Sequence, residues 1–223
     1  MADIKLVFGN KKYSSWSLRP WLLLRHFGIE FEEIRIALNM QQTPQRVREF
    51  SPTGKVPVLV HQGITVWDSL AICEYVSEEL LGGRGWPREL KAKYRARSIS
   101  CEMHSGFGAL RSQWPMNVAL QRKMPRNAEL DKDIARVEGI WNECLQSGGP
   151  WLFGEFSIAD AMFAPVALRF YSYQPELSEG ASMYVKTMLA HPAIKEWMAA
   201  GAAEQEVIKE DEVSFLLGEP GWV

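Results

Sequence analysis

The pattern of apolar residues changes near residue 82, and this change limits the fold more than any other feature of the chain. Before residue 82, short apolar or alternating runs typical of strands are separated by helical stretches. After it, only helical spacing is found. A chain of 223 residues can form two small domains. We therefore predict an α/β domain over residues 1–81, a turn-rich linker over 82–88 and an all-helical domain over 89–223.

In the first domain the expected element order is β-α-β-α-β-β-α. Strands are expected over Ile4–Phe8, Phe31–Leu38, Pro57–His61 and Ile64–Trp67. Helices are expected over Trp16–Phe27, Thr43–Phe50 and Asp68–Leu80. This order, followed by a helical bundle, predicts a thioredoxin-like domain joined to an all-α domain.

The second domain is expected to contain only helices. Apolar spacing predicts one long helix over Leu90–Trp114 and others over Leu130–Leu145, Ile158–Tyr171, Met183–Ala190 and Pro192–Gly201. The helix from Ile158 is the most apolar and should be central, with Ser157 and Asp160 forming a capping box at its start. The charged tail from Glu204 is either a packed extension or loosely held.

Composition excludes several function classes. The formal net charge of −2 offers no basic excess for nucleic acid or an anionic membrane. The longest apolar stretch, Ala161–Leu168, is too short to span a bilayer, and the N-terminus lacks the apolar core of a signal peptide. We therefore expect a cytoplasmic protein.

Cysteine and histidine spacing argues against metal and disulfide chemistry. Cys73, Cys101 and Cys144 form no CxxC pair, and all three are expected to be buried small apolar residues. The four histidines show neither i,i+4 pairing nor a neighbouring carboxylate cluster, so no metal site is expected.

Four motifs in order carry a family resemblance. They are Ser14-Ser15-Trp16-Ser17-Leu18-Arg19, Ser51-Pro52-Thr53-Gly54-Lys55-Val56-Pro57-Val58-Leu59, Asp68-Ser69-Leu70-Ala71-Ile72-Cys73-Glu74-Tyr75 and Ser157-Ile158-Ala159-Asp160. Together they resemble cytosolic glutathione S-transferases of the serine type, in a bacterial branch with the zeta-like SSxSxR pattern. A cysteine-type transferase or a thioredoxin role is disfavoured, because no cysteine precedes Cys73.

The resemblance implies a glutathione site in the first domain. A serine at a helix start can simply cap backbone N–H groups, but a hydroxyl at a helix N-terminus also favours a bound thiolate. Ser14 is the expected donor, with Ser15 and then Ser17 as alternatives. The resemblance also implies a cis peptide bond between Val56 and Pro57. The implied contacts to the rest of glutathione are Gln42, Lys55, Val56, Pro57, Asp68 and Ser69.

Spacing on the expected long helix suggests a second-substrate pocket. Such an apolar stripe is more often core, but in this family one face of that helix overlooks the thiol. The pocket candidates are Trp16, Met103, His104, Phe107, Arg111 and Trp114. Trp16 stands where the zeta class has cysteine, which argues against maleylacetoacetate isomerase activity.

The function favoured by these patterns is conjugation of glutathione to an electrophilic apolar compound, as in detoxification. A second hypothesis is glutathione-dependent isomerisation of an unsaturated dicarboxylate, with Arg111 or Arg19 holding a carboxylate. A third is a transferase fold without activity that serves as an interaction module. The resemblance also implies a homodimer, with the first domain of one subunit against the bundle of the other.

Overall fold

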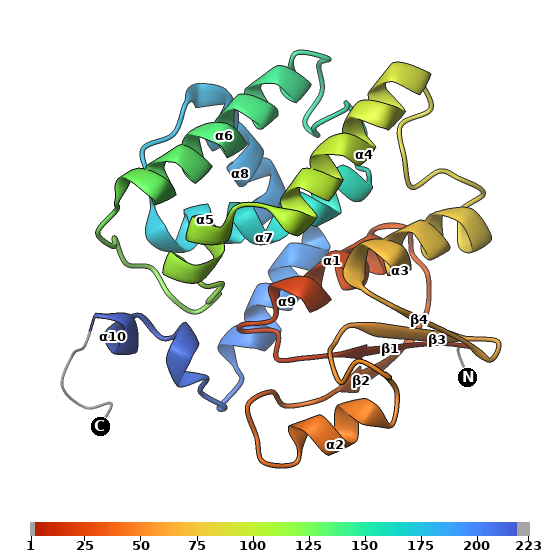
Figure 1. Ribbon diagram of the computed structural model, residues 1–223. Helices are drawn as coiled ribbons and strands as arrows, with labels where there is room; N and C mark the ends of the chain where they lie inside the picture. The colour runs from red at the N-terminus through yellow and green to blue at the C-terminus, as the bar shows by residue number, and fades with distance from the viewer. Residues whose placement is uncertain (1–2, 218–223) are drawn as a thin grey trace.

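The computed structural model describes residues 3–217 and contains a mixed four-stranded sheet beside a helical domain (Figure 1). The sheet is formed by β1 (Ile4–Phe8), β2 (Glu32–Arg35), β3 (Val58–His61) and β4 (Ile64–Trp67), in the order β2-β1-β3-β4. β1 pairs with β2 in parallel and with β3 antiparallel, and β3 pairs antiparallel with β4. The expected thioredoxin-like order of elements and the α/β-plus-α fold class are confirmed.

Helices cover both faces of this sheet. α1 (Ser15–His26) and α3 (Ser69–Tyr75), which continues as a π-helical segment over Val76–Leu80, lie on the side facing the helical domain, and α2 (Thr43–Arg48) lies on the other (Figure 1). Alternation in the strands produces this arrangement. Leu6 and Phe8 pack toward α1, whereas Val7 and Val58 pack against Val47 of α2.

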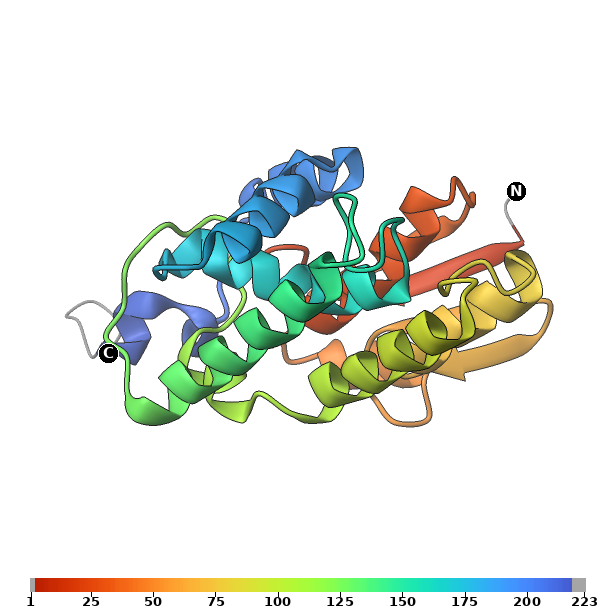
Figure 2. The same ribbon diagram turned by 90° about the horizontal axis from the view of Figure 1, so that it is seen from above.

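The helical domain is built around one buried helix. Its helices are α4 (Leu90–Ser105), α5 (Gly108–Gln113), α6 (Ala128–Leu145), α7 (Ile158–Tyr173), α8 (Glu179–Ala190), α9 (Pro192–Ala202) and the short α10 (Val213–Leu216), with a 3-10 turn over Lys209–Asp211. α7 contacts α1, α4 and α8. In the view from above, its cyan ribbon lies between the blue helix α8 and the yellow-green helix α4 (Figure 2). The two domains therefore share one core through α1 and α7.

The capping box expected at the start of α7 is present and fully buried. Asp160 accepts hydrogen bonds from the Ser157 N–H and hydroxyl, the Leu152 N–H and the Tyr184 hydroxyl, at 2.9–3.1 Å. Burial raises the pKa of Asp160 to about 6 although these donors favour the ionised form. Asp160 thus ties the loop before α7 to α8.

The expected single helix over Leu90–Trp114 is wrong. The chain breaks at Gly106 and Phe107, and Phe107 has a φ of 57°. A Cβ on Gly106 would lie 2.8 Å from the Glu102 carbonyl oxygen, so the turn needs glycine there. The carboxylate of Asp133 in α6 accepts a hydrogen bond from the Leu110 N–H and caps the new helix. Packing against α6 therefore overrides the local helical pattern.

Other differences are smaller. The second strand is shorter than expected, since the Leu38 N–H bonds to the Asn10 side chain rather than to β1. α8 begins earlier than expected, at Glu179, because Ser178 caps it. Cys73 and Cys144 are buried as expected, but Cys101 is exposed, because it lies on the outer face of α4.

Two further findings concern the ends and the surface. The tail from Glu204 to Glu212 packs on the first domain, which settles the alternative left open by its composition. Residues 1–2 and 218–223 of the expected domains lie outside the described residues. Within residues 3–217 no helix combines the length and the apolarity that a membrane crossing requires.

Candidate functional site

A cleft with two lobes opens between the domains, where α1 begins. The large lobe has a volume of about 740 Å³ and the small lobe about 540 Å³. Trp16, Lys55, Val56 and Arg111 line both lobes, so the two spaces adjoin. Lys55, Val56 and the α1 start come from the first domain, and Arg111 comes from α5. The fold thus brings residues of both domains to one cavity.

The three candidate serines differ in position. Ser14 is buried at the N-cap of α1, lines the large lobe and donates a hydrogen bond from its hydroxyl to Ser17 Oγ at 2.7 Å. Ser15 begins α1 and lines the same lobe. Ser17 is fully buried behind Ser14, where its Oγ also accepts from the Gly9 N–H at 3.1 Å. Ser17 therefore supports Ser14 instead of facing the cleft.

The floor of the small lobe is made by the Val56–Pro57 and Asp68-Ser69 segments. The Val56–Pro57 peptide bond is cis. Asp68 has a φ of 72° and caps α3, accepting from the Leu70 N–H at 2.8 Å and the Ala71 N–H at 3.4 Å. Its other carboxylate oxygen lies 2.6 Å from His104 Nε2 in α4. Burial opposes its ionisation, but these hydrogen bonds lower the pKa of Asp68 below its ordinary value.

A buried guanidinium stands behind the small lobe. Arg19 Nη1 donates to the hydroxyl oxygen of Ser69 at 3.2 Å, and its Cζ lies 4.2 Å from the Trp16 ring centroid. No carboxylate in the described part of the chain forms an ion pair with Arg19, and its Nε is buried without a partner there. Burial, helped by Arg169 and Arg111, lowers the pKa of Arg19 to about 9. Arg19 remains charged at neutral pH. Because it forms no ion pair with a carboxylate among residues 3–217, its positive charge is poorly compensated.

The large lobe contains residues that sequence patterns did not suggest. Tyr13, Arg169 and Asp211 line it, from the loop before α1, from α7 and from the tail. Burial lowers the pKa of Arg169 to about 10 and raises the pKa of Asp211 to about 6. The one available signal was Arg169, a lone cation in the most apolar helix. Asp211 and Tyr13 became neighbours only through the fold of the tail.

The remaining candidates divide into cleft and core. Trp16 and Arg111 line the cleft, with the Arg111 Cζ 4.9 Å from the Trp16 ring centroid. Three others are core side chains: Met103, Phe107 and Trp114. His104 holds Asp68 and packs edge-on against Trp16. Gln42 is exposed and lines neither lobe, whereas Lys55 lines both.

The tyrosine beside the serines is occupied elsewhere. The Tyr13 hydroxyl donates to the Glu212 carboxylate, and burial together with this carboxylate raises the pKa of Tyr13 above its ordinary value. Among residues 3–217, no group of three or more His, Cys, Asp or Glu side chains is placed to hold a metal ion. Hydroxyls, backbone groups, the carboxylates of Asp68 and Asp211, and cations are thus the chemistry that this cleft offers.

A thioredoxin-like domain joined to a helical bundle, with a serine at the first helix start and a cleft between the domains, defines a class of two-domain proteins. The family description "Glutathione S-transferase, N-terminal domain" matches residues 13–79, and "Glutathione S-transferase, C-terminal domain" matches residues 124–200. The chain belongs to the glutathione S-transferase family.

Relatives and solved structures agree with this assignment. Maleylacetoacetate isomerase of Rattus norvegicus is 31% identical over 170 residues, covering 74% of this chain and 76% of the relative. Glutathione S-transferase T1 of Arabidopsis thaliana is 26% identical over 148 residues, covering 60% and 59%. A glutathione transferase homologue from Burkholderia, solved with bound glutathione, has a TM-score of 0.70 at 21% identity and covers 90% of this chain and 99% of its own. The last similarity concerns the fold.

Proposed function

We propose that this protein binds glutathione across the small lobe and holds its sulfur as a thiolate beside Ser14. The observation that carries the proposal is the Ser14 hydroxyl, which lies in the cleft at the N-terminus of a 12-residue helix. Glutathione is the co-substrate of the family to which the chain belongs. The family and the position of Ser14 thus support the same chemistry.

Thiolate formation needs no formally charged partner. In the bound state the Ser14 hydroxyl turns from Ser17 to donate to the sulfur, and the Ser17 hydroxyl donates to Ser14 Oγ while still accepting from the Gly9 N–H. A free thiol has a pKa near 8.5, and each unit of depression corresponds to about 1.4 kcal/mol. One charge-assisted hydrogen bond and the helix terminus can supply roughly two units.

The rest of the tripeptide is assigned to the small lobe. The Val56 backbone pairs with the cysteinyl unit as an added strand would. Ser69 and the start of α3 take the γ-glutamyl carboxylate, and Arg19 behind Ser69 places a positive charge near it. Asp68, kept ionised by His104, faces the ammonium group. Lys55 takes the glycine carboxylate. The exposed position of Gln42 argues against its expected contact.

The first candidate reaction is conjugation in the large lobe. The thiolate forms a carbon–sulfur bond to an electrophilic carbon, and the displaced electron pair leaves with a leaving group or moves onto a conjugated carbonyl. The rate gain comes from the higher thiolate fraction and from holding both reactants together. Trp16 gives the electrophile an apolar wall.

The second candidate is isomerisation of an unsaturated dicarboxylate. The thiolate adds to the cis double bond, the new single bond rotates, and the thiolate leaves again, so that glutathione is regenerated. Arg111 and Arg169, two of the three cations that line the large lobe, favour an anionic substrate. The rat relative named maleylacetoacetate isomerase supports this candidate. Trp16, where the zeta class has cysteine, argues against it.

We also propose a homodimer in the cytoplasm. Trp67 on the edge strand β4 and Tyr94 on α4 are 44% and 58% exposed. Large apolar side chains on these two elements suit an interface in which the first domain of one subunit meets α4 of the other. Light scattering of the wild-type protein should give twice the chain mass of 25.4 kDa, and Trp67→Glu should shift it toward the monomer.

One experiment tests the glutathione site and the role of Ser14. Calorimetry should detect glutathione binding, and the ultraviolet thiolate band of the bound tripeptide should titrate about two units below the free thiol. Ser14→Ala should raise that apparent pKa by about one unit, whereas the matched control Ser15→Ala should leave it unchanged. Equal titration in wild type and Ser14→Ala would falsify Ser14 as the donor.

The candidate reactions are separated by substrate. Conjugation of a chloronitrobenzene and isomerisation of maleylacetone are measured with the same enzyme and the same glutathione concentration. Activity with the first compound alone supports conjugation, and activity with the second alone supports isomerisation. Binding of glutathione without either activity supports the third hypothesis, the interaction module.

A further inference from the structure

The loop that leads into Ser14 is held from the other end of the chain. This loop, residues 9–14, joins β1 to α1 and turns on the Asn10 carbonyl, which accepts from the N–H groups of Tyr13 and Ser14. The Gly9 N–H donates to Ser17 Oγ. The N–H groups of Lys11 and Lys12 have no acceptor within the loop, and buried backbone donors need one.

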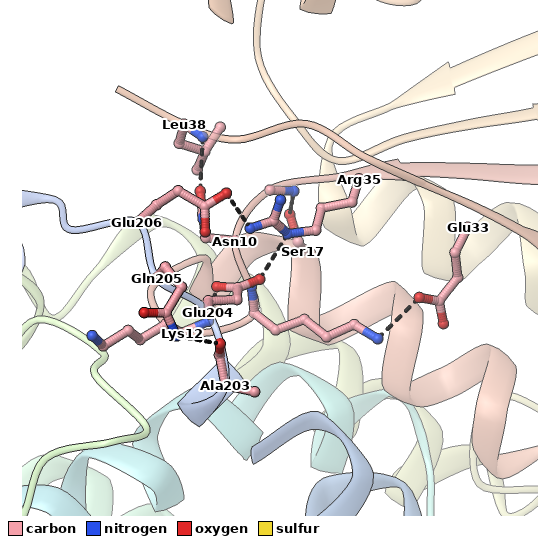
Figure 3. A network of polar contacts seen from close by, with 12 residues as sticks. Asn10, Lys12, Ser17, Glu33, Arg35, Leu38, Ala203, Glu204, Gln205 and Glu206 are labelled. Carbon is pink, nitrogen blue, oxygen red and sulfur yellow. Dashed lines mark hydrogen bonds and ion pairs between the residues drawn. The ribbon is translucent and has the colours of Figure 1, made fainter. Parts of the chain in front are cut away.

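Glu204 supplies that acceptor. Its Oε1 accepts from the Lys11 N–H at 2.9 Å, and its Oε2 accepts from the Lys12 N–H at 3.0 Å. The Glu204 side chain is 8% exposed, so this contact is shielded from water. Arg35 of β2 neutralises it through an Nε–Oε1 contact of 2.8 Å. Figure 3 shows Glu204 between Arg35 and the loop.

Two more contacts reinforce the same arrangement. Gly201 in α9 lies against the loop so closely that a Cβ there would come within 2.9 Å of the Lys11 carbonyl carbon and the Lys12 nitrogen. Glu212, further along the tail, accepts from the Tyr13 hydroxyl. The tail thus contacts three consecutive residues, 11 to 13, immediately before the serine.

We propose that Glu204 is a positioning residue that fixes the 9–14 loop and thereby holds the Ser14 hydroxyl where the glutathione sulfur binds. The inference rests on the proposed function of Ser14. The physical reason is the short distance along the chain. Ser14 follows Lys12 by two positions, so a shift of the Lys12 amide also displaces Ser14. A misplacement of about 1 Å in such a group can lower a rate by up to roughly 100-fold.

The test compares Glu204→Gln and Glu204→Ala with the matched control Glu206→Ala. Glu206 lies on the same segment and bonds to the same Arg35, at 2.6 Å, but Figure 3 draws no hydrogen bond or ion pair from it to the loop. Glu204→Ala should raise the pKa of the bound thiol by about one unit and lower kcat/KM at neutral pH about ten-fold, with less than a three-fold change in glutathione Kd. Glu204→Gln keeps one acceptor oxygen and should show a smaller change, and Glu206→Ala should match wild type.

Amide hydrogen exchange separates this proposal from the proposed function. Exchange of the Lys11 and Lys12 amides should rise in Glu204→Ala and in Gly201→Ala, with or without glutathione. Faster exchange with an unchanged thiol pKa would overturn the positioning role, as would an equal change in Glu206→Ala. A wild-type protein without a thiolate band would refute the proposed function of Ser14. Independently of that result, unchanged exchange of the Lys11 and Lys12 amides in Glu204→Ala would refute the anchoring of the loop by Glu204. If Glu204→Ala does not fold, Glu204→Gln and Gly201→Ala carry the same comparison.

Discussion

Replacing Arg19 by methionine should stabilise the protein while weakening glutathione binding. Burial lowers the pKa of this guanidinium from 12.5 to about 9, which corresponds to a cost of about 5 kcal/mol for keeping the charge buried. Methionine has a similar length and carries no charge. A buried charge replaced by an apolar side chain of similar volume often leaves a protein equally or more stable.

Two favourable contacts are lost in the same substitution. The hydrogen bond from Arg19 to the Ser69 hydroxyl contributes about 2 kcal/mol as a charged donor. The contact with the Trp16 ring at 4.2 Å contributes about 1 kcal/mol. The free energy of unfolding should therefore rise by about 2 kcal/mol in Arg19→Met, which raises Tm by roughly 4–8 °C for a chain of this size. Glutathione Kd should increase about ten-fold, because the positive charge behind Ser69 is gone.

Urea unfolding without ligand and calorimetry with glutathione measure the two effects. Arg97→Met is the matched control, because Arg97 also lies over an indole ring, that of Trp86, but forms an ion pair with Glu74 at 3.1 Å. The control should not become more stable and should bind glutathione normally. A loss of stability in Arg19→Met, or an unchanged Kd, would refute the view that the site stores an uncompensated charge for an anionic ligand.

Three further outcomes are expected. Asp160→Asn removes the acceptor for two of four buried hydrogen bonds and should lower the free energy of unfolding by about 3 kcal/mol in urea titration. Burial and His191 lower the pKa of His26 from 6.5 to about 4, so the unfolded chain takes up this proton more readily. The contribution of neutral His26 to the free energy of unfolding should be fully present above pH 6.5 and should be lost as the pH drops to 4. We expect a loss of about 1–2 kcal/mol, reduced because the ring is partly exposed, and His26→Gln should flatten this pH dependence. Ser17→Ala leaves the Gly9 N–H without its acceptor and should cost about 1–2 kcal/mol of stability in thermal unfolding.

Local patterns were sufficient for the elements whose cause is local. The capping box at Ser157 and Asp160 follows from side chains three residues apart. The same kind of reasoning failed at Gly106 and Phe107, because the carboxylate that caps the second helix comes from Asp133 in α6. The spacing of apolar residues within one segment contains no information about a contact with another helix.

The candidate site divides in the same way. Motifs in the first domain predicted Ser14, Val56 and Ser69 as site residues, and the structure places all three at the cleft, just before a strand or at the start of a helix. Arg169 and Asp211 could not be found in this manner, since they reach the large lobe from α7 and from the tail. Ser17 shows the same limit, because its motif position does not reveal that its hydroxyl faces the Gly9 N–H.

By itself the sequence determined the two-domain division, the order of elements in the first domain and the family, because strand and helix periodicity, caps and turns act over a few residues. The tertiary structure decided how Ser14 is held, which charges face the cleft and where the tail lies. Those features depend on contacts such as that between Glu204 and Lys11, 193 positions apart, and their strength comes from burial that only the packed chain creates.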